Sequence, residues 1–233
     1  MDYKNNKKYY LPPKINTILL LVGIAVGTIG IILLFTNDRS AGLMAGMVAS
    51  VVGFGMAIVA KTSSVGGGEI DDAALRYKLL LVDNGEFYNP DRVKPGTVYI
   101  SEGYSKENSE YYRKGGDGIL RSTEYGVAQY SMEKDSLKVI AHYFSFTREY
   151  DESKTVMIKY QDIKNLEKVT VFRPDERFVN NHFYKLVLTD INDNVVIETP
   201  AQDTLLAEEF AEKLLRKVKR VNQLIAEGDN APQ

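Results

Sequence analysis

Two long apolar runs dominate the first quarter of the chain. Residues 15–35 and residues 41–60 contain no charged side chain, and only residues 36–40 separate them. A helix rises about 1.5 Å per residue, so each run is long enough to cross the hydrocarbon core of a bilayer, which is about 30 Å thick. The short connection requires the two helices to run antiparallel. The pattern therefore predicts a transmembrane α-helical hairpin over residues 15–61.

The charges that flank this hairpin predict its orientation. Four lysines precede the first run: Lys4, Lys7, Lys8 and Lys14. The connection between the runs carries one cation, Arg39, beside Asp38. By the positive-inside rule, residues 1–14 and the C-terminal part lie in the cytoplasm, and we expect a multi-pass protein of the cell inner (plasma) membrane. A cleaved signal peptide is the alternative, but its apolar region would be shorter and no second apolar run would follow it at once.

Small residues recur at four-residue spacing in both runs. Gly23 and Gly27 form such a pair in the first run, and Gly42 and Gly46 form one in the second. Glycine at this spacing lets helix backbones approach closely, which supplies packing contacts where lipid provides no hydrophobic drive. We expect these glycines to pack the hairpin against itself, with a contact between two copies as the alternative. Neither run contains an ionisable residue, which argues against an ion pathway or proton relay.

The next sixty residues have a weaker pattern. Residues 62–70 are rich in Ser and Gly and predict a flexible linker. In the lead-in over residues 71–120, acidic residues followed by apolar ones predict a short helix, with a strand through residues 77–82 as the alternative. Gly, Asn, Asp, Ser and Tyr predominate after that, so we expect mostly loop with one strand near residues 98–100.

From residue 121 onward apolar and polar residues alternate. Six runs rich in β-branched and aromatic residues predict strands at 123–131, 137–146, 154–160, 168–172, 183–189 and 194–199. Residues 133–135 and 192–194 have the composition of hairpin turns. The pattern predicts antiparallel strands in a soluble domain.

A helical periodicity follows the last predicted strand. Asp203 or Thr204 is the expected N-cap, and the helix extends to about residue 226. Its apolar positions form one stripe to lay on a sheet: Leu206, Phe210, Leu214, Val218, Val221 and Ile225. Residues 227–233 are expected to be a disordered tail. The fold class is therefore a transmembrane helical hairpin plus a mainly β domain, antiparallel and closed by a C-terminal helix.

This order of elements resembles a family. The strand meander, the segment IKYQDIKNLEKVTV at 158–171, the hairpin LVLTDINDNVVIET at 186–199 and the terminal helix are together similar to a pleckstrin-homology-like domain over residues 121–226. The resemblance implies a bent β-sandwich with the helix at one end. Two transmembrane helices before such a domain resemble bacterial membrane-anchored members of the family. Lipid-binding eukaryotic members carry a basic cluster on the first two strands, but residues 132–136 are followed by Lys138 alone, so inositide recognition is not implied.

Composition excludes several classes of function. Beyond residue 61 the chain has 23 Lys and Arg against 29 Asp and Glu, which argues against a nucleic-acid partner. The chain has no Cys, so it has no disulfide, no thiolate metal site and no cysteine nucleophile. His142 and His182 have no partner at metal-ligand spacing. We therefore expect no metal and no cofactor.

The remaining polar motifs favour surface roles. The carboxylate pairs Asp71/Asp72 and Asp151/Glu152 lie near predicted turns and are interpreted as solvated. A late basic cluster complements the dipole of the C-terminal helix or contacts anionic lipid, and it consists of Arg216, Lys217, Lys219 and Arg220. Eight tyrosines are either sheet residues or a partner-binding face: Tyr104, Tyr111, Tyr112, Tyr125, Tyr130, Tyr143, Tyr150 and Tyr160.

These observations predict a protein that is not an enzyme. We expect a scaffold anchored in the lipid bilayer that displays its cytoplasmic domain to a protein partner or assembles as a homo-oligomer. A signal-gated effector is the alternative, in which the β domain binds a nucleotide messenger and the hairpin oligomerises in the bilayer. An enzymatic site within residues 83–120 is a third hypothesis, because that segment has no assigned structure.

Overall fold

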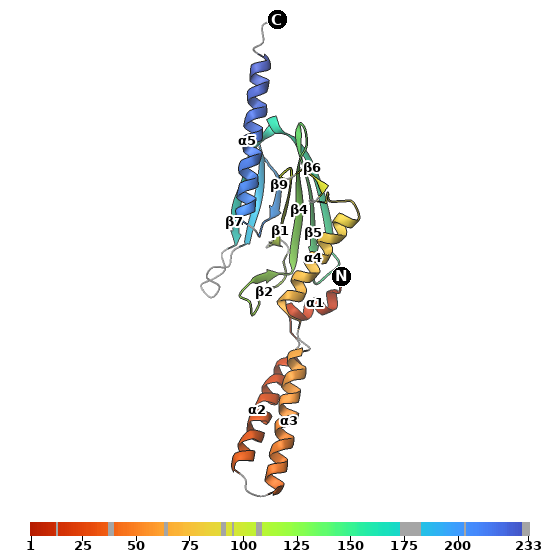
Figure 1. Ribbon diagram of the computed structural model, residues 1–233, viewed down its shortest axis with the longest axis vertical. Coiled ribbons are helices and arrows are strands. Elements are labelled where there is room, and N and C mark those ends of the chain that lie inside the picture. Colours follow the sequence, from red (N-terminus) through yellow and green to blue (C-terminus); the bar gives the residue numbers. More distant parts are fainter. Residues whose placement is uncertain are drawn as a thin grey trace. The chain divides into compact units, whose positions relative to one another are not determined.

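A computed structural model describes residues 1–12, 14–36, 40–62, 65–89, 92–94, 96–105, 109–172, 183–202 and 204–229 (Figure 1). The chain forms two compact units, residues 2–70 and residues 71–233. We call the first the hairpin unit and the second the β unit.

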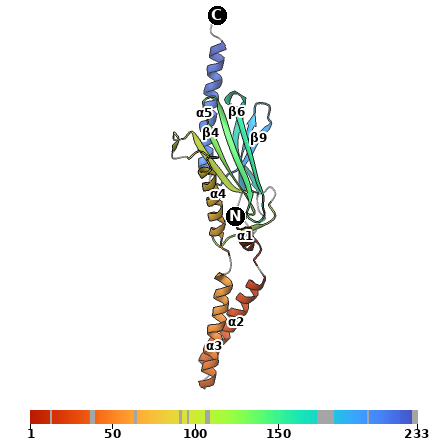
Figure 2. The same cartoon turned by 90° about the vertical axis from the view of Figure 1, so that its right-hand side faces the viewer.

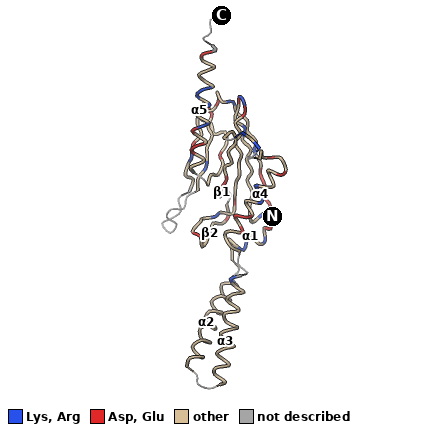
Figure 3. Tube along the Cα trace, in the orientation of Figure 1, with Lys and Arg blue, Asp and Glu red and all other residues tan. Residues whose placement is uncertain are grey.

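The hairpin unit contains two long helices after a short first helix, α1 (Tyr3–Tyr10). Helices α2 (Lys14–Thr36) and α3 (Ser40–Thr62) lie side by side, as both views show (Figure 1, Figure 2). Their described residues carry charge only near the ends (Figure 3). Both helices are long and apolar enough to cross a membrane, judged by length and composition. The structure confirms the predicted hairpin of two apolar helices.

Glycine forms the contact between α2 and α3. Gly23, Gly27 and Gly30 are the buried residues of α2. A Cβ atom at Gly23 would lie 2.6 Å from the carbonyl oxygen of Gly53, and a Cβ atom at Gly30 would lie 2.5 Å from the backbone nitrogen of Ser50. Those positions belong to backbone atoms, which cannot yield unless the helices separate. The two backbones are therefore as close as glycine alone permits.

The α3 side of this contact differs from the spacing that the sequence suggested. Gly46 faces α2, because a Cβ atom there would lie 2.9 Å from the carbonyl oxygen of Gly30. Gly42 is only half-buried. Gly53 lies at the centre instead, where a Cβ atom would lie 2.7 Å from the carbonyl oxygen of Gly23.

The β unit is built around two antiparallel sheets. The first has the order β1-β4-β5-β6 and the second the order β7-β8-β9. The strands of the first sheet are β1 (Val98–Ser105), β4 (Glu124–Met132), β5 (Ser136–Ser145) and β6 (Asp151–Lys159). Those of the second are β7 (Ile163–Phe172), β8 (Phe183–Asp190) and β9 (Val195–Pro200).

Shorter elements complete the unit. Helix α4 (Gly67–Asp83) leads into it, and a two-stranded ribbon of β2 (Tyr112–Lys114) and β3 (Leu120–Ser122) lies between β1 and β4 in the chain. A 3₁₀ turn, η2 (Tyr160–Asp162), joins the two sheets. Helix α5 (Thr204–Asp229) ends the described chain.

The turn between β8 and β9 shows how local sequence sets the register. Asp190 accepts hydrogen bonds from the backbone nitrogens of Asn192 and Asn194, at 2.8 and 2.9 Å. Asp193 adopts the left-handed conformation with φ of 66°, which Asp tolerates better than most residues. These bonds confirm the turn predicted at residues 192–194.

The core lies between the two sheets and α5. Tyr130 and Leu137 from the first sheet, Leu188 from the second, and Leu214 from α5 are all fully buried in one cluster. Tyr99 stacks on Phe210 with ring centroids 4.9 Å apart. In Figure 1, α5 runs beside β7 and its C-terminal turns continue beyond the sheets. This packing places the predicted C-terminal helix on the sheets, as expected.

The first sheet is covered on its other face as well. Leu81 of α4 and Phe87 pack against Val127 of β4 in a second buried cluster. Successive residues of a strand point to opposite faces, so a strand covered on both faces is buried along its length. All residues of β4 except Met132 are accordingly buried.

Several expectations from the sequence require correction. The predicted linker at 62–70 is partly helical, because α4 begins at Gly67, and the alternative strand at 77–82 is wrong. The strand predicted near residues 98–100 is confirmed as the start of β1, but β1 extends to Ser105 and pairs with β4 along its length, and the segment expected to be mostly loop also contributes β2 and β3. In this segment, tertiary pairing determines the strands more than local composition does.

The apolar stripe of α5 also differs at its two ends. Leu206 and Ile225 are 53% and 43% exposed, whereas Ala207 and Ala211 are buried. The helix extends to Asp229, so only residues 230–233 of the predicted tail lie outside the described chain. Asp203, one of the two predicted caps, also lies outside the described residues, and the structure does not describe the Thr204 side chain.

The close contact between α2 and α3 predicts that Gly53→Ala separates the hairpin. The added methyl group must displace backbone atoms of α2, and overpacking of this kind costs about 1–3 kcal/mol. Labels for energy transfer at Ile15→Cys and Val59→Cys would report separation during a dodecyl sulfate titration. We expect Gly53→Ala to separate at lower dodecyl sulfate.

The matched control is Gly55→Ala, where a Cβ atom has nothing within 4 Å. This variant should separate at the same dodecyl sulfate content as the wild type. Equal behaviour of the two alanine variants would contradict the role assigned to the glycine contact.

Candidate functional site

A polar pocket of about 210 Å³ lies in the β unit, where the first sheet and β9 face each other. Its walls combine carboxylates, tyrosines and aliphatic side chains with one lysine: Ser105, Glu124, Tyr125, Tyr143, Tyr150, Glu152, Lys154, Val156, Val196, Ile197 and Glu198. We call it the Glu124 pocket. It is the candidate functional site because charged groups here occupy positions that face the interior.

Strand register explains how charged residues reach this position. Tyr143 on β5 pairs with Glu152 on β6, and Val139 pairs with Val156. Alternate residues share a face, so Glu152 and Lys154 continue the face on which Val156 packs against the core. The inward face of β6 therefore changes from apolar to charged along its length.

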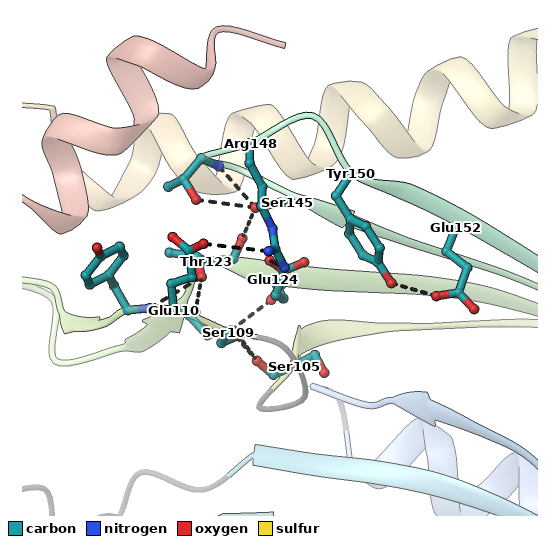
Figure 4. A network of polar contacts seen from close by, with 12 residues as sticks. Ser105, Ser109, Glu110, Thr123, Glu124, Ser145, Arg148, Tyr150 and Glu152 are labelled. Carbon is teal, nitrogen blue, oxygen red and sulfur yellow. Dashed lines mark hydrogen bonds and ion pairs between the residues drawn. The ribbon is translucent and has the colours of Figure 1, made fainter.

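Glu124 is the most deeply buried acid of the pocket, with 3% of its surface exposed. Arg148 donates from Nη2 to Oε1 of Glu124 at 3.1 Å, and its Nη1 lies 3.6 Å from Oε1 of Glu110 (Figure 4). Oε2 of Glu124 is buried and makes no hydrogen bond to any described residue. Burial raises the pKa of Glu124, and hydrogen bonding with Ser145 and the charge of Arg148 offset this only in part.

A second group of contacts surrounds Glu152. Tyr150 donates its hydroxyl to Oε2 of Glu152 at 2.6 Å, and Nζ of Lys154 lies 3.0 Å from Oε1. These hydrogen bonds lower the pKa of Glu152. The hydrogen bond between Tyr150 and Glu152 also raises the pKa of Tyr150 to about 12. Glu152 is therefore ionised at neutral pH.

The loop before β2 borders the network around Glu124 (Figure 4). The Ser109 hydroxyl donates to the backbone oxygen of Ser105 at 2.6 Å. Thr123 accepts from the backbone nitrogen of Glu110 through its hydroxyl at 3.0 Å. These bonds fix Glu110 beside Arg148, so the guanidinium is held between two carboxylates.

Arg121 on β3 makes contacts that the sequence did not predict. Arg121 is fully buried and donates to Asp71 of α4, at 2.9 and 2.5 Å, and to Asp117, at 3.0 and 2.6 Å. Arg121 lowers the pKa of Asp117 to about 2. Asp71 is therefore an ion-pair residue that holds α4, and its interpretation as a solvated turn residue is wrong.

The predicted histidine and carboxylate candidates have structural partners. His142 is buried with Nε2 3.2 Å from Oε2 of Glu86, and its ring lies 5.7 Å from that of Phe87. Asp151 accepts a hydrogen bond from the hydroxyl of Tyr77. His182 lies outside the described residues. Among the residues that the structure describes, no group of three His, Asp or Glu has the arrangement of a metal site.

The basic cluster on α5 divides into two parts. Arg216, Lys219 and Arg220 are exposed. Lys217 is half-buried, donates to the backbone oxygen of Glu133 at 2.7 Å, and lies over the ring of Tyr160. Burial lowers the pKa of Lys217. Lys217 thus holds the β4–β5 turn against α5, and only the other three residues present charge to the outside.

The tyrosines also separate into different environments. Tyr104, Tyr125, Tyr130 and Tyr160 are buried, so they belong to the packing of the unit. Tyr143 and Tyr150 line the pocket, together with Tyr125. No single tyrosine face collects all eight predicted residues. An aromatic and acidic pocket is nevertheless present, which the sequence alone did not locate.

Burial disfavours the ionised form of Glu124, so we predict that Glu124→Gln stabilises the protein at neutral pH. The pKa of Glu124 is higher in the folded state than in the unfolded state, so the folded state binds the proton more tightly. The free energy of unfolding of the wild type therefore falls as pH rises from the unfolded pKa to the folded pKa. Removing the charge should raise the free energy of unfolding at pH 7 by on the order of 1 kcal/mol. The gain should vanish below the unfolded pKa.

Urea unfolding of the full chain in detergent at several pH values measures this difference. Glu209→Gln, on an exposed position of α5, is the matched control and should leave stability unchanged at every pH. A loss of stability in Glu124→Gln at pH 7 would contradict the assignment of Glu124 as a buried charge with incomplete pairing.

Comparison with protein-family models, with curated proteins and with solved structures gives no match. The function is therefore argued from the hairpin, the β unit and the Glu124 pocket.

Proposed function

We propose that this protein is a membrane-anchored, non-enzymatic interaction protein. In this account α2 and α3 span the membrane, and the β unit acts in the cytoplasm as a platform for a protein partner or a second copy. The observation that carries the proposal is the pair of long helices with apolar outward faces. Among the exposed side chains of these helices are Leu21, Phe35 and Val51, at 63%, 86% and 73% exposure.

Exposed apolar surface on this scale is costly in water. Insertion into a bilayer removes the cost for both helices, because their backbone groups are satisfied within each helix. The lysines before α2 favour an orientation with both ends of the hairpin on the cytoplasmic side.

The β unit supports a pleckstrin-homology-like interpretation. Two packed antiparallel sheets with α5 on the shared core agree with the bent sandwich and terminal helix that this resemblance implies. In this interpretation β1 is the first strand of the sandwich, so the connection between the first two strands is residues 106–123 and not residues 132–136. Arg121 in that connection is already bound to Asp71 and Asp117.

A non-enzymatic role is favoured by the partners of the reactive groups. His142 and Tyr143 are neighbours on β5, so they point to opposite faces of the sheet. His142 thus lies away from the Glu124 pocket, beside Glu86 and Phe87. The hydroxyl of Ser145 is engaged with the backbone oxygen of Thr123. His142 and Ser145 therefore do not form the nucleophile and base pair that hydrolytic catalysis requires.

The effector alternative is less favoured by the same geometry. A nucleotide messenger carries phosphate, and the four carboxylates in and beside the pocket outnumber the three cations paired with them, so the site disfavours phosphate. The buried glycines of α2 are also used within the hairpin, so they do not offer a free surface for oligomerisation.

The absence of Cys makes the proposed topology directly testable. Single cysteines at Asn5, Ser40 and Ser153 can be labelled with a membrane-impermeant maleimide in intact spheroplasts of a bacterial expression host. We expect Ser40→Cys to react before lysis, and Asn5→Cys and Ser153→Cys to react only after lysis. Labelling of Asn5→Cys or Ser153→Cys in intact spheroplasts would contradict the orientation, and release of the chain by alkaline carbonate would contradict the anchor.

A further inference from the structure

We propose that the Glu124 pocket binds a small organic cation, an alkylammonium group, between its carboxylates and tyrosine rings. The proposal concerns the β unit alone and does not depend on membrane insertion of the hairpin. It assigns a ligand class to a pocket in which charged side chains interrupt the apolar core.

The charge of the pocket selects a cation. Three carboxylates line the pocket, and a fourth, Glu110, lies beside Arg148. These four acids face three cations, Arg148, Lys154 and Lys185, which leaves a formal charge of −1 when all of them are ionised. A positively charged ligand is attracted into such a site, whereas a phosphate or carboxylate ligand is repelled. The aliphatic side chains Val156 and Ile197 in the same walls suit the methylene groups of an alkyl chain.

The pocket already shows how it holds cations. Nζ of Lys154 lies 5.6 Å from the ring centroid of Tyr143, and the guanidinium of Arg148 lies 5.4 Å from that of Tyr150. Both distances are within the range of a cation–π attraction. Each cation is also paired with a carboxylate, Lys154 with Glu152 and Arg148 with Glu124. Tyrosine ring and carboxylate therefore act together as the recognition unit.

One carboxylate oxygen remains without such a partner. Glu124 is 97% buried, and its Oε2 makes no hydrogen bond to a described residue. A buried carboxylate oxygen without a hydrogen-bond donor lowers the stability of the fold. If the residue only filled space, the uncharged side chain of Gln would do so at a smaller cost. An ammonium group supplies both the donor and the compensating charge. Glu124 is thus the residue that we assign to the ligand.

The size of the pocket limits the ligand. A volume of about 210 Å³ is below the roughly 300–1,000 Å³ of sites that hold drug-sized molecules. A primary amine on a chain of a few carbon atoms fits this space. Two sources share that chemistry, a free diamine and the side chain of a lysine presented by a partner, and the experiment separates them.

Calorimetry of the full chain in lipid nanodiscs tests the proposal. The probes are 1,4-diaminobutane for a free amine, N-acetyl-lysine amide for a lysine side chain, and butane-1,4-diol as the neutral control. We expect at least one amine to bind with a dissociation constant below about 1 mM, and the diol not to bind. Glu124→Gln should weaken binding by about tenfold or more, because it removes the charged acceptor.

Two further variants make the result decisive. Glu152→Gln removes a second carboxylate of the pocket and should also weaken amine binding, which gives an independent test of the site. Glu209→Gln on α5 should bind as the wild type does. Failure of both amines to bind, or equal binding by wild type and both pocket variants, would overturn the proposal while leaving the membrane topology result unaffected.

Discussion

The close approach of α2 and α3 is the contact on which the first part of the molecule depends. Both helices are apolar around their circumference and offer no described ion pair to each other. Packing contact must therefore hold them together, and it does so through glycines that bring backbone atoms against backbone atoms. The bulky side chains then point outward, which gives the hairpin a surface suited to lipid. The same glycines cannot also serve contacts between copies without opening the hairpin.

In the β unit, the first sheet has apolar side chains on both faces, so both faces must be covered. The second sheet and α5 cover one face, and α4 with Phe87 covers the other. The buried guanidinium of Arg121 binds two half-exposed carboxylates, and its ion pair with Asp71 holds α4 in place. Removing both Asp71 and Asp117 would leave the buried charge of Arg121 uncompensated. On the inward face the core ends at the Glu124 pocket, where Oε2 of Glu124 is buried without a hydrogen bond to a described residue.

Much of this fold follows from sequence pattern, and the exceptions have physical causes. The hairpin is visible because its two runs are long and uniformly apolar, and the strands after residue 121 and α5 are visible because each has a regular apolar period. Strand β1 was predicted only at its start, residues 98–100, because the rest of it is set by pairing with β4 across a long connection. The pairing of Asp71 with Arg121 spans 50 positions and has no local signature. The pocket was missed for a similar reason, since Glu124 and Glu152 meet only after the register is known. One signal was available: Glu152 and Lys154 occupy the same alternate positions as Val156.

The central claim is that α2 and α3 lie in the hydrocarbon core of a bilayer while the β unit remains in water. The chain has no Trp, so one introduced Trp reports on its own environment. Val51→Trp places it on the outward face of α3, and Thr155→Trp places it on an exposed position of β6. In vesicles with lipids brominated along their acyl chains, the account predicts strong quenching of the Trp at position 51 and none at position 155. Equal and weak quenching at both positions would contradict it.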